Sequence, residues 1–249
     1  MSRDTILSRA DLDFLLHDWL RVEELCGRER YAEHSRETID AVVDLSADLA
    51  ARYFAPHNRA SDLTEPRLVG EEVELIPEIG EALRAFADAD LVGASMDAEV
   101  GGMQLPHTAF LACMAWFYAA NVSTAAYPLL TTANANLLLA HGTPELVERF
   151  VTPMLDGRYT GTMCLSEPQA GSNLADITTR AEPAGDGTYR LFGQKMWISA
   201  GEHPNAENIV HLVLAKVPGS PPAPAASACS WCPSSWSTTT ARSASATTW

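Results

Sequence analysis

The sequence has few basic residues and no cluster of them. Its 249 residues include 17 Lys and Arg against 32 Asp and Glu, so the formal net charge is -15. Nucleic-acid backbones and anionic membranes both attract clustered Lys and Arg, and this balance therefore argues against either as a partner. The acidic excess is most simply explained as a contribution to solubility.

The sequence also shows no pattern typical of a targeting segment or of a disulfide framework. The N-terminus, MSRDTILSRADLDFLL, mixes acidic residues through its length and lacks the continuous apolar core of a signal peptide. The most apolar run, 109–120, is shorter than a bilayer span and is typical of a buried helix. Five cysteines at irregular spacing do not form a disulfide pattern, so a cytoplasmic location is expected.

Motifs for phosphate or metal chemistry are absent as well. There is no Walker loop or GxGxxG turn, and the seven histidines show no HExxH or similar spacing, so no metal site is expected. Glu202 and His203 could suggest a general base, but a histidine at a loop end is expected to be solvated. Cys229 and Cys232 form a CxxC, which elsewhere suggests redox or zinc chemistry.

The first part of the chain has the period of helices. Apolar residues recur at three- and four-residue steps over 38–54 and 77–89, and the almost wholly apolar stretch 105–120 is typical of a central helix. Another helix is expected over 131–141. Thr143 and Pro144 then supply the N-cap and first residue of a helix that runs to about residue 155.

Near Tyr159 the period changes to that of strands. Strands are expected at 159–166, 195–199 and 208–215. The segments DITTRAEP and TYRLFG flank the turn residues 185–187, and together they predict a hairpin. The sequence thus predicts an α+β protein. An all-helical N-terminal domain would cover 1–156, and a small β-barrel or β-sandwich domain would cover 157–222.

The stretch MCLSEPQAGSN, residues 163–173, ends a strand in a turn longer than a surface hairpin needs. Pro168 favours an extended Glu167, and Gly171 permits a positive φ or the close approach of a bulky group. Backbone N–H groups and the hydroxyls of Ser166 and Ser172 would then face one spot, as donors to an electron-rich heterocycle or a carbonyl. A capped loop without a ligand is the alternative.

Several segments together resemble the acyl-CoA dehydrogenase family. CLSEPQAGSN resembles the family's strand and loop beside the flavin, and GQKMWISAGEH resembles its second flavin-facing strand. EVGGMQLP and AHGTPELVERFVTPMLDGRYTGTMCL resemble an inter-helix loop and the helix that leads into the β domain. YFAPHNRASD and GEHPNAENIVHLVLAKVPGSPP most resemble the long-form subgroup that includes 3-methylthiopropanoyl-CoA dehydrogenases. The resemblance covers roughly residues 13–222.

This resemblance implies an FAD-dependent dehydrogenation, in which a glutamate removes the α-proton of an acyl-CoA thioester and the β-hydride moves to N5 of the flavin. Leu165 and Ser166 would hydrogen-bond the edge of the flavin ring, and Met163 would pack beside it. Trp197 and Ser199 would line the ring from the next strand. Donors held in advance toward the reduced flavin would act as an oxyanion hole does.

The loop would serve the phosphates and the substrate. Gly171 and Ser172 would border the acyl-CoA or flavin phosphate region, with Ser172 also contacting substrate. Asn173 stands where the family usually has Asp, which keeps an Asx-type cap but loses a charge. The implied partners are an acyl-CoA substrate and electron-transfer flavoprotein as the electron acceptor, and the full-length protein would be a homo-oligomer.

The last stretch, 223–249, is built almost wholly from Ala, Ser, Thr and Trp, with no Leu, Ile, Val, Gly, Asp, Glu or Lys. That composition predicts no folded element. If each codon of this stretch is read one base early, and GC-rich codons are chosen where the amino acid allows several, the stretch can encode GTRGISLFVVPKFLVDDDGSLGERNDV, which resembles the family's continuation. We hypothesise a frameshift from about residue 223, which would make the CxxC accidental. Third bases in the gene that are incompatible with this string would refute the hypothesis.

A chain of this kind would lack the family's C-terminal helical bundle, which carries the catalytic glutamate and, through a partner subunit, much of the FAD adenosine site. No catalytic residue is therefore expected here. Because general-base catalysis is worth roughly 10²–10⁴-fold, dehydrogenase turnover by the chain should be negligible, and measurable turnover of an acyl-CoA would contradict this. Two alternatives stay open: a flavin oxidase or monooxygenase, which would consume O₂, and a non-catalytic flavin or acyl-CoA binding module.

Overall fold

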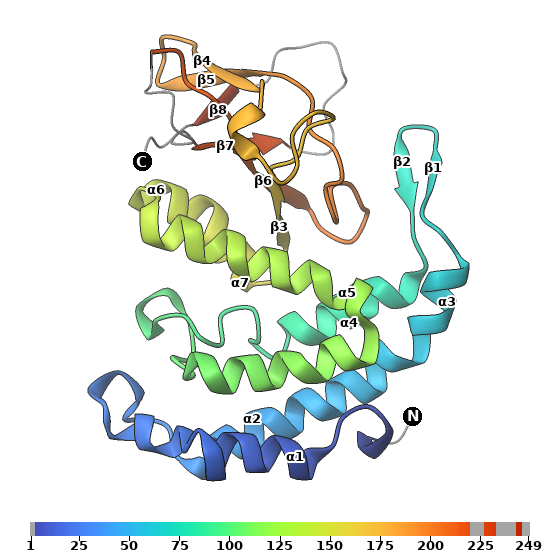
Figure 1. Cartoon of the computed structure of the whole chain (residues 1–249), viewed down its shortest axis with the longest axis vertical. Coiled ribbons are helices and arrows are strands. Elements are labelled where there is room, and N and C mark those ends of the chain that lie inside the picture. Colours follow the sequence, from blue (N-terminus) through green and yellow to red (C-terminus); the bar gives the residue numbers. More distant parts are fainter. Residues whose placement is uncertain (1–2, 220–226, 233–242, 246–249) are drawn as a thin grey trace. The chain divides into compact units, whose positions relative to one another are not determined.

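The computed structural model describes residues 3–219, 227–232 and 243–245 (Figure 1). The chain separates into two compact units: the first holds residues up to 129 together with 155–157, and the second holds 130–154 and the described residues from 158 on. The division into domains at residue 156 remains a prediction about independent folding.

The first unit is built mainly from helices. Ser35 caps α2 in a reciprocal capping box with Thr38, and Pro77 occupies the first position of α4, as helix-start chemistry favours. The helices are α1 (Arg9–Asp13), α2 (Arg36–Leu49), α3 (Asn58–Leu63), α4 (Pro77–Ala87) and the first part of α5 (His107–His141). Wider π-helical turns extend α1 over Phe14–Trp19 and α2 over Ala50–Phe54. The helices expected over 38–54 and 77–89 are confirmed.

The prediction that this region is all-helical is wrong at one place. Strands β1 (Arg67–Val69) and β2 (Glu72–Glu74) form an antiparallel hairpin, in which Leu68 pairs with Val73. Gly70 has a φ of +67°, a conformation that glycine adopts without a Cβ clash. Leu68 and Val69 are exposed, so the hairpin shows no alternation of buried and exposed residues from which it could be predicted.

The core of the first unit lies where α2, α4 and α5 meet. The ring of Phe117 packs edge-on against Phe54 at 4.8 Å and against Phe86 at 5.0 Å between centroids. These three side chains are almost fully buried, and aromatic pairs in this geometry add about 0.5–1.5 kcal/mol beyond their burial.

The long helix α5 is interrupted at Asn121, whose φ of -164° is not helical. The side-chain oxygen of Asn121 accepts a hydrogen bond from the N–H of Thr124, so it caps the start of the second half. By length and composition α5 could cross a membrane. However, 61% of its most apolar 18-residue stretch is buried within the protein, as expected for a core helix. The two helices predicted over 105–120 and 131–141 are thus confirmed, one on each side of this break.

The second unit holds the rest of α5 and the main strands. Thr143 caps α6 (Pro144–Leu146) as predicted, and a π-helical turn, Val147–Val151, leads into α7 (Thr152–Leu155). The strands are β3 (Tyr159–Cys164), β4 (Arg180–Pro183), β5 (Thr188–Phe192), β6 (Asn208–Leu214), β7 (Ser227–Cys232) and β8 (Ser243–Ser245). The predicted hairpin is confirmed, since β4 and β5 pair antiparallel with Ala181 opposite Leu191.

These strands form two three-stranded sheets, in the orders β3-β6-β7 and β4-β5-β8. Strand β3 runs parallel to β6, with Gly161 opposite Val210, and β6 runs antiparallel to β7. Main-chain hydrogen bonds from Ala181 to Lys216 and from Lys216 to Thr179 join the two sheets just after β6. Within the described residues the strands do not close into a barrel, so the barrel form of the fold prediction is not supported there.

Two short strands lie in the segment whose composition predicted no folded element. β7 and β8 add to the edges of β6 and β5 through main-chain pairing, which requires no particular side chains, so the prediction is wrong for those nine positions. The other tail residues, and the side chains of Cys229 and Cys232, lie outside the described part. In the other reading frame the residues of β7 would be ISLFVV, a pattern typical of a strand. The frameshift itself remains a prediction.

Asn134, on the second half of α5, fastens that helix to the β3–β6 pair. Its buried side-chain amide donates to the carbonyl of Thr162 at 3.2 Å and to that of Val210 at 2.8 Å. Gly161 leaves the space for it, because a Cβ there would lie 2.5 Å from the Asn134 Cβ. The close approach of helix and strand therefore requires glycine at this position.

Gly161→Ala is accordingly expected to lower the free energy of unfolding by about 1–3 kcal/mol, because the added methyl must displace Asn134. Chemical denaturation would measure the loss. Gly171→Ala is the matched control: a Cβ there meets nothing within 4 Å, so the change should be at most about 1 kcal/mol in either direction. Equal effects at both positions would contradict the role assigned to Gly161.

Candidate flavin-facing site

The turn that follows β3 is closed on itself by its main chain. Glu167 and Ala170 exchange hydrogen bonds, from N–H to carbonyl, at 2.8 and 3.0 Å. Pro168 and Gln169 lie exposed at the tip of this turn. Further on, the side-chain oxygen of Asn173 accepts from the N–H of Ala175, which is the Asx-type cap expected from the sequence.

Glu167 anchors the turn from within. Its side chain is 1% exposed, and its carboxylate accepts hydrogen bonds at 2.7–3.0 Å from five donors. The donors are Nζ of Lys195, the side-chain amide of Gln169, the N–H and hydroxyl of Thr178, and the N–H of Thr179. Burial by itself would raise the pKa of this carboxyl, but the bonds from Lys195 and the two threonines outweigh it and hold the pKa well below its usual range.

The second segment, 193–203, is not the strand that was predicted over 195–199. Trp197 has a φ of +62° and Ala200 a φ of +54°, and residues in this left-handed region interrupt an extended strand. Gly193, with a φ of +150°, packs so closely on Thr179 that a Cβ would lie 2.3 Å from its hydroxyl. The N–H of Met196 donates to the carbonyl of Ser166 at 3.1 Å and ties this segment to the end of β3.

Trp197 is the most exposed large apolar side chain of the described residues, at 84%. An indole that is both exposed and held in a left-handed backbone conformation is unusual, because the conformation costs about 1–3 kcal/mol and the surface gains nothing from burial. Such outliers gather at ligand-binding and catalytic sites. Both features are compatible with the prediction that Trp197 contacts a ligand.

The predicted site residues fall into two groups. Met163, Leu165 and Ser166 are half-buried at the end of β3, and hydrogen bonds join this stretch to the segment that carries Trp197. Within the described residues, no bond is found for the N–H groups of Leu165 and Ser166 or for the Ser166 hydroxyl. These donors are free for a ligand.

Gly171, Ser172 and Ser199 are exposed, and no hydrogen bond within the described part connects them to the first group. The suggestion that Gly171 has a positive φ is wrong, since it does not adopt one. Nor does the protein itself crowd its Cα. The other alternative, the close approach of a bulky group, stays a prediction.

Sequence reasoning missed Lys195 and underrated Glu167 and His203. Glu167 and Lys195 are 28 residues apart, so no local pattern links them, although a lysine is itself a signal in a chain that has only two. His203 was expected to be solvated, and this is wrong: it is 3% exposed. Its Nε2 lies 3.0 Å from the Thr160 hydroxyl, and its Nδ1 accepts from the N–H of Asn205.

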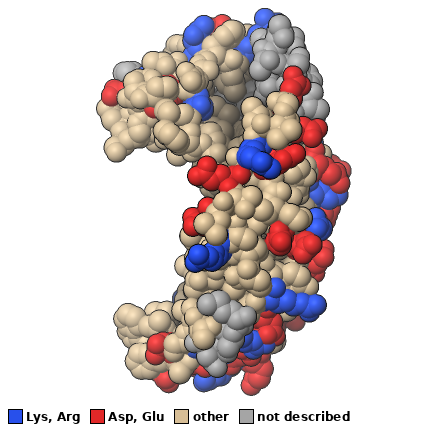
Figure 2. Space-filling model, turned by 90° about the vertical axis from the view of Figure 1, so that its right-hand side faces the viewer, with Lys and Arg blue, Asp and Glu red and all other residues tan. Residues whose placement is uncertain are grey.

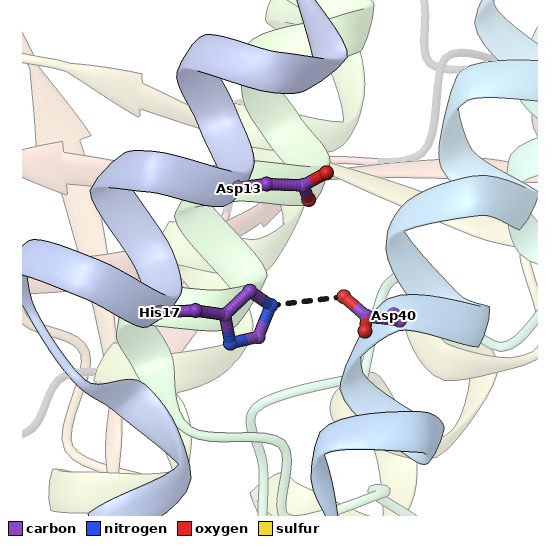
Figure 3. Close-up of side chains that lie close together, drawn as sticks. All are labelled: Asp13, His17 and Asp40. Carbon is purple, nitrogen blue, oxygen red and sulfur yellow. Dashed lines mark hydrogen bonds and ion pairs between the residues drawn. The ribbon is translucent and has the colours of Figure 1, made fainter.

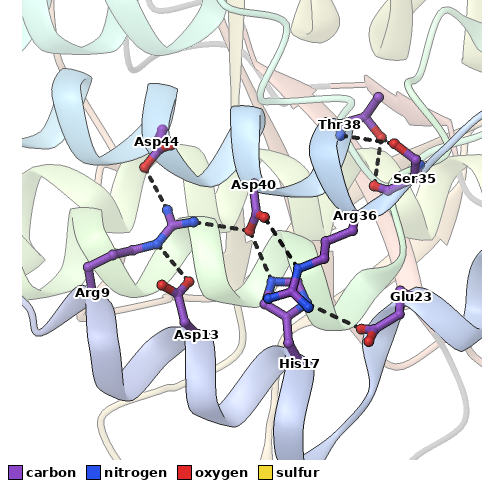
Figure 4. Close-up of polar contacts among 9 residues, drawn as sticks. All are labelled: Arg9, Asp13, His17, Glu23, Ser35, Arg36, Thr38, Asp40 and Asp44. Atoms are coloured by element: carbon purple, nitrogen blue, oxygen red, sulfur yellow. Dashed lines mark hydrogen bonds and ion pairs between the residues drawn. The ribbon is translucent and has the colours of Figure 1, made fainter.

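A second polar cluster lies in the first unit, between α1 and α2. Asp13, His17 and Asp40 have ligand atoms within 4.8 Å of one another, a spacing that could hold a metal (Figure 3). Figure 4 shows that Arg9 already bonds Asp13, Asp40 and Asp44, at 2.7–3.0 Å. The guanidinium thus supplies the positive charge that a metal would bring, and the cluster serves to clamp the two helices.

The surface agrees with the charge balance of the sequence. On the face shown in Figure 2, Lys and Arg side chains are scattered among more numerous Asp and Glu side chains. Nothing on that face resembles the continuous basic stripe that binds nucleic acid.

Residues 36–158 match the family model described as "Acyl-CoA dehydrogenase, N-terminal domain". The chain carries the N-terminal domain of the acyl-CoA dehydrogenases. The resemblance inferred from the motifs is thereby confirmed at the level of the family.

Individual acyl-CoA dehydrogenases extend the similarity into the second unit. The chain is 34% identical over 206 residues to 3-methylmercaptopropionyl-CoA dehydrogenase of Ruegeria pomeroyi, covering 83% of this chain and 34% of that protein. It is 29% identical over 231 residues to a butyryl-CoA dehydrogenase of Syntrophomonas wolfei, covering 91% and 38%. The chain thus spans little more than a third of the length of these relatives.

The fold agrees with solved acyl-CoA dehydrogenases. The structure of an acyl-CoA dehydrogenase complexed with FAD from Bacillus anthracis superposes with a TM-score of 0.65 at 18% identity, over 86% of this chain and 36% of that one. The mixed helical and sheet architecture is therefore that of this family.

Proposed function

We propose that the chain forms the flavin-facing part of an FAD-dependent acyl-CoA dehydrogenase. The observation that carries the proposal is the pairing of unbonded donors at Leu165 and Ser166 with the exposed Trp197 on the segment bonded beside them. These groups fit a planar heterocycle: the amides and the hydroxyl suit its polar edge, and the indole suits its face. When bound, FAD would accept the hydride from the β-carbon of an acyl thioester.

This chain's own residues would bind and orient the ring. The N–H groups of Leu165 and Ser166 would donate to its edge, and donors directed at the place where negative charge develops favour reduction. Met163 and Trp197 would exclude water on either side. Gly171 and Ser172 would contact phosphate or the acyl-CoA, because they are exposed and the space above Gly171 is open, and Ser199 would line the ring beside Trp197.

The general base is not assigned to any described residue. The family resemblance places it in a C-terminal helical domain, and it likewise suggests an acyl-CoA substrate, electron-transfer flavoprotein as acceptor and a homo-oligomeric whole protein. We propose flavin binding without turnover for the chain by itself. Oxygen consumption by a flavin-loaded chain would favour an oxidase or monooxygenase instead.

A titration with FAD tests the proposal. Tryptophan fluorescence of the chain should fall on saturation, and Trp197→Phe should remove most of this quenching and weaken binding about tenfold, since stacking on an aromatic ring is worth about 1–3 kcal/mol. Trp19→Phe is the matched control, because Trp19 is also exposed but lies in the first unit. Absence of saturable binding would contradict the proposed function.

A further inference from the structure

The side chain of Lys195 links the main chain at Leu165 to the carboxylate of Glu167. Its Nζ donates to the carbonyl of Leu165 and to Oε1 of Glu167, each at 2.9 Å. The side chain is only 11% exposed. The other lysine of the chain, Lys216, also donates to a carbonyl, that of Ala175 at 2.9 Å, but there the contact is exposed.

The bond to Leu165 determines where the next N–H points. The Leu165 carbonyl and the Ser166 N–H belong to one planar peptide unit, in which the oxygen and the hydrogen lie on opposite sides. Lys195 holds the oxygen, so the N–H is directed away from Lys195. The next carbonyl, that of Ser166, is held by the N–H of Met196. Consecutive residues of one segment thus fix two consecutive peptide planes.

The same bond also strengthens the donor. Hydrogen bonds to charged groups are roughly twice as strong as neutral ones, and bonds in series polarise each other. An ammonium on the Leu165 oxygen draws electron density from the amide and makes the Ser166 N–H a better donor. Glu167 keeps the ammonium in place, and its own carboxylate is satisfied by the remaining donors of the turn.

We propose that Lys195 is a positioning residue that aims and polarises the Ser166 N–H through the Leu165–Ser166 peptide. The identity of the acceptor, the flavin edge, rests on the proposed function. The orientation and polarisation of the Ser166 N–H by Lys195 do not. Glu167 holds the lysine, and Lys195 acts on the peptide.

The test separates the peptide contact from the ion pair. Lys195→Met alone would leave the buried Glu167 carboxylate without the counter-charge of its lysine, so the comparison is made in a Glu167→Gln background, where Lys195 is expected to keep its bond to Leu165. Adding Lys195→Met should move the Ser166 amide proton upfield in the NMR spectrum of the full chain and slow its base-catalysed exchange several-fold, because the amide proton becomes less acidic without the ammonium. Lys195→Arg should restore most of the chemical shift and of the exchange rate. Lys216→Met should leave the Ser166 chemical shift unchanged and alter the exchange rate by less than twofold.

FAD titration of the same variants gives the second readout. Loss of Lys195 should weaken FAD binding about tenfold and make reduction of the bound flavin less favourable, and Lys195→Arg should recover most of the affinity. If the parent chain bound no FAD, the proposed function would fail, and the Ser166 amide would still decide this inference. An unchanged Ser166 resonance and exchange rate without Lys195, or an equal effect of Lys216→Met, would overturn it.

Discussion

Glu167→Ala is expected to lower the free energy of unfolding by about 3–5 kcal/mol, the usual cost of breaking a buried ion pair on one side. The substitution removes the acceptor of five hydrogen bonds and leaves the ammonium of Lys195 largely buried beside a void. The N–H groups of Thr178 and Thr179 lose their partner at the same time. Few surface carboxylates on a turn would have a comparable effect.

Denaturant unfolding of the chain measures this loss. Glu182→Ala is the matched control, because Glu182 pairs with Arg180 at 2.6 Å on the exposed face of β4 and should cost less than about 1 kcal/mol. The double variant Glu167→Ala/Lys195→Met should recover part of the loss, since no unpaired charge remains. A Glu167→Ala chain as stable as the Glu182→Ala chain would refute the anchoring role.

The second large effect is a loss of stability on mild acidification that depends on His203. Burial, with a smaller contribution from the nearby His211, lowers the pKa of His203 from 6.5 to about 4. The Asn205 N–H donates to Nδ1, so protonation of that nitrogen would break the bond. The folded state therefore requires the neutral ring.

The pH dependence of stability follows from the difference between the pKa of His203 in the folded and in the unfolded chain. Because the folded-state pKa lies below the unfolded one, the unfolded chain takes up the proton first as the pH falls. The contribution of His203 is complete above pH 6.5 and is lost progressively down to about pH 4. At about 1.4 kcal/mol per pKa unit, the total is up to about 3 kcal/mol.

His203→Gln isolates this contribution. Its amide can donate to Thr160 and accept from Asn205, but it does not titrate. The free energy of unfolding, measured from pH 7 to pH 4, should fall less steeply in the variant, while the carboxyl groups titrate alike in both chains and cancel in the difference. His141→Gln, at an exposed position on α5, should leave the slope unchanged. Identical slopes for His203→Gln and the parent would rule out the buried neutral ring.

Much of the element order could be predicted because helices and hairpins depend on neighbours a few residues apart. The Thr143–Pro144 start signal, the apolar period of α2 and the turn residues before β5 each act locally. The predictions that were wrong concern local patterns that the tertiary structure overrides. The sequence of 195–199 is typical of a strand, yet the backbone of Trp197 is in the left-handed region. The composition of 227–232 predicts no folded element, yet these residues pair with β6.

The amino-acid sequence by itself determined the family and the helical and β regions, and it predicted the stretch that we propose faces the flavin, because motif order and periodicity depend on the order of residues along the chain. Only the tertiary structure decided that Glu167 and Lys195 form a buried pair, that His203 is enclosed and that Asn134 needs a glycine opposite it. Burial, charge pairing and close approach depend on residues that are distant in the chain and adjacent in space, so they exist only once the fold has formed.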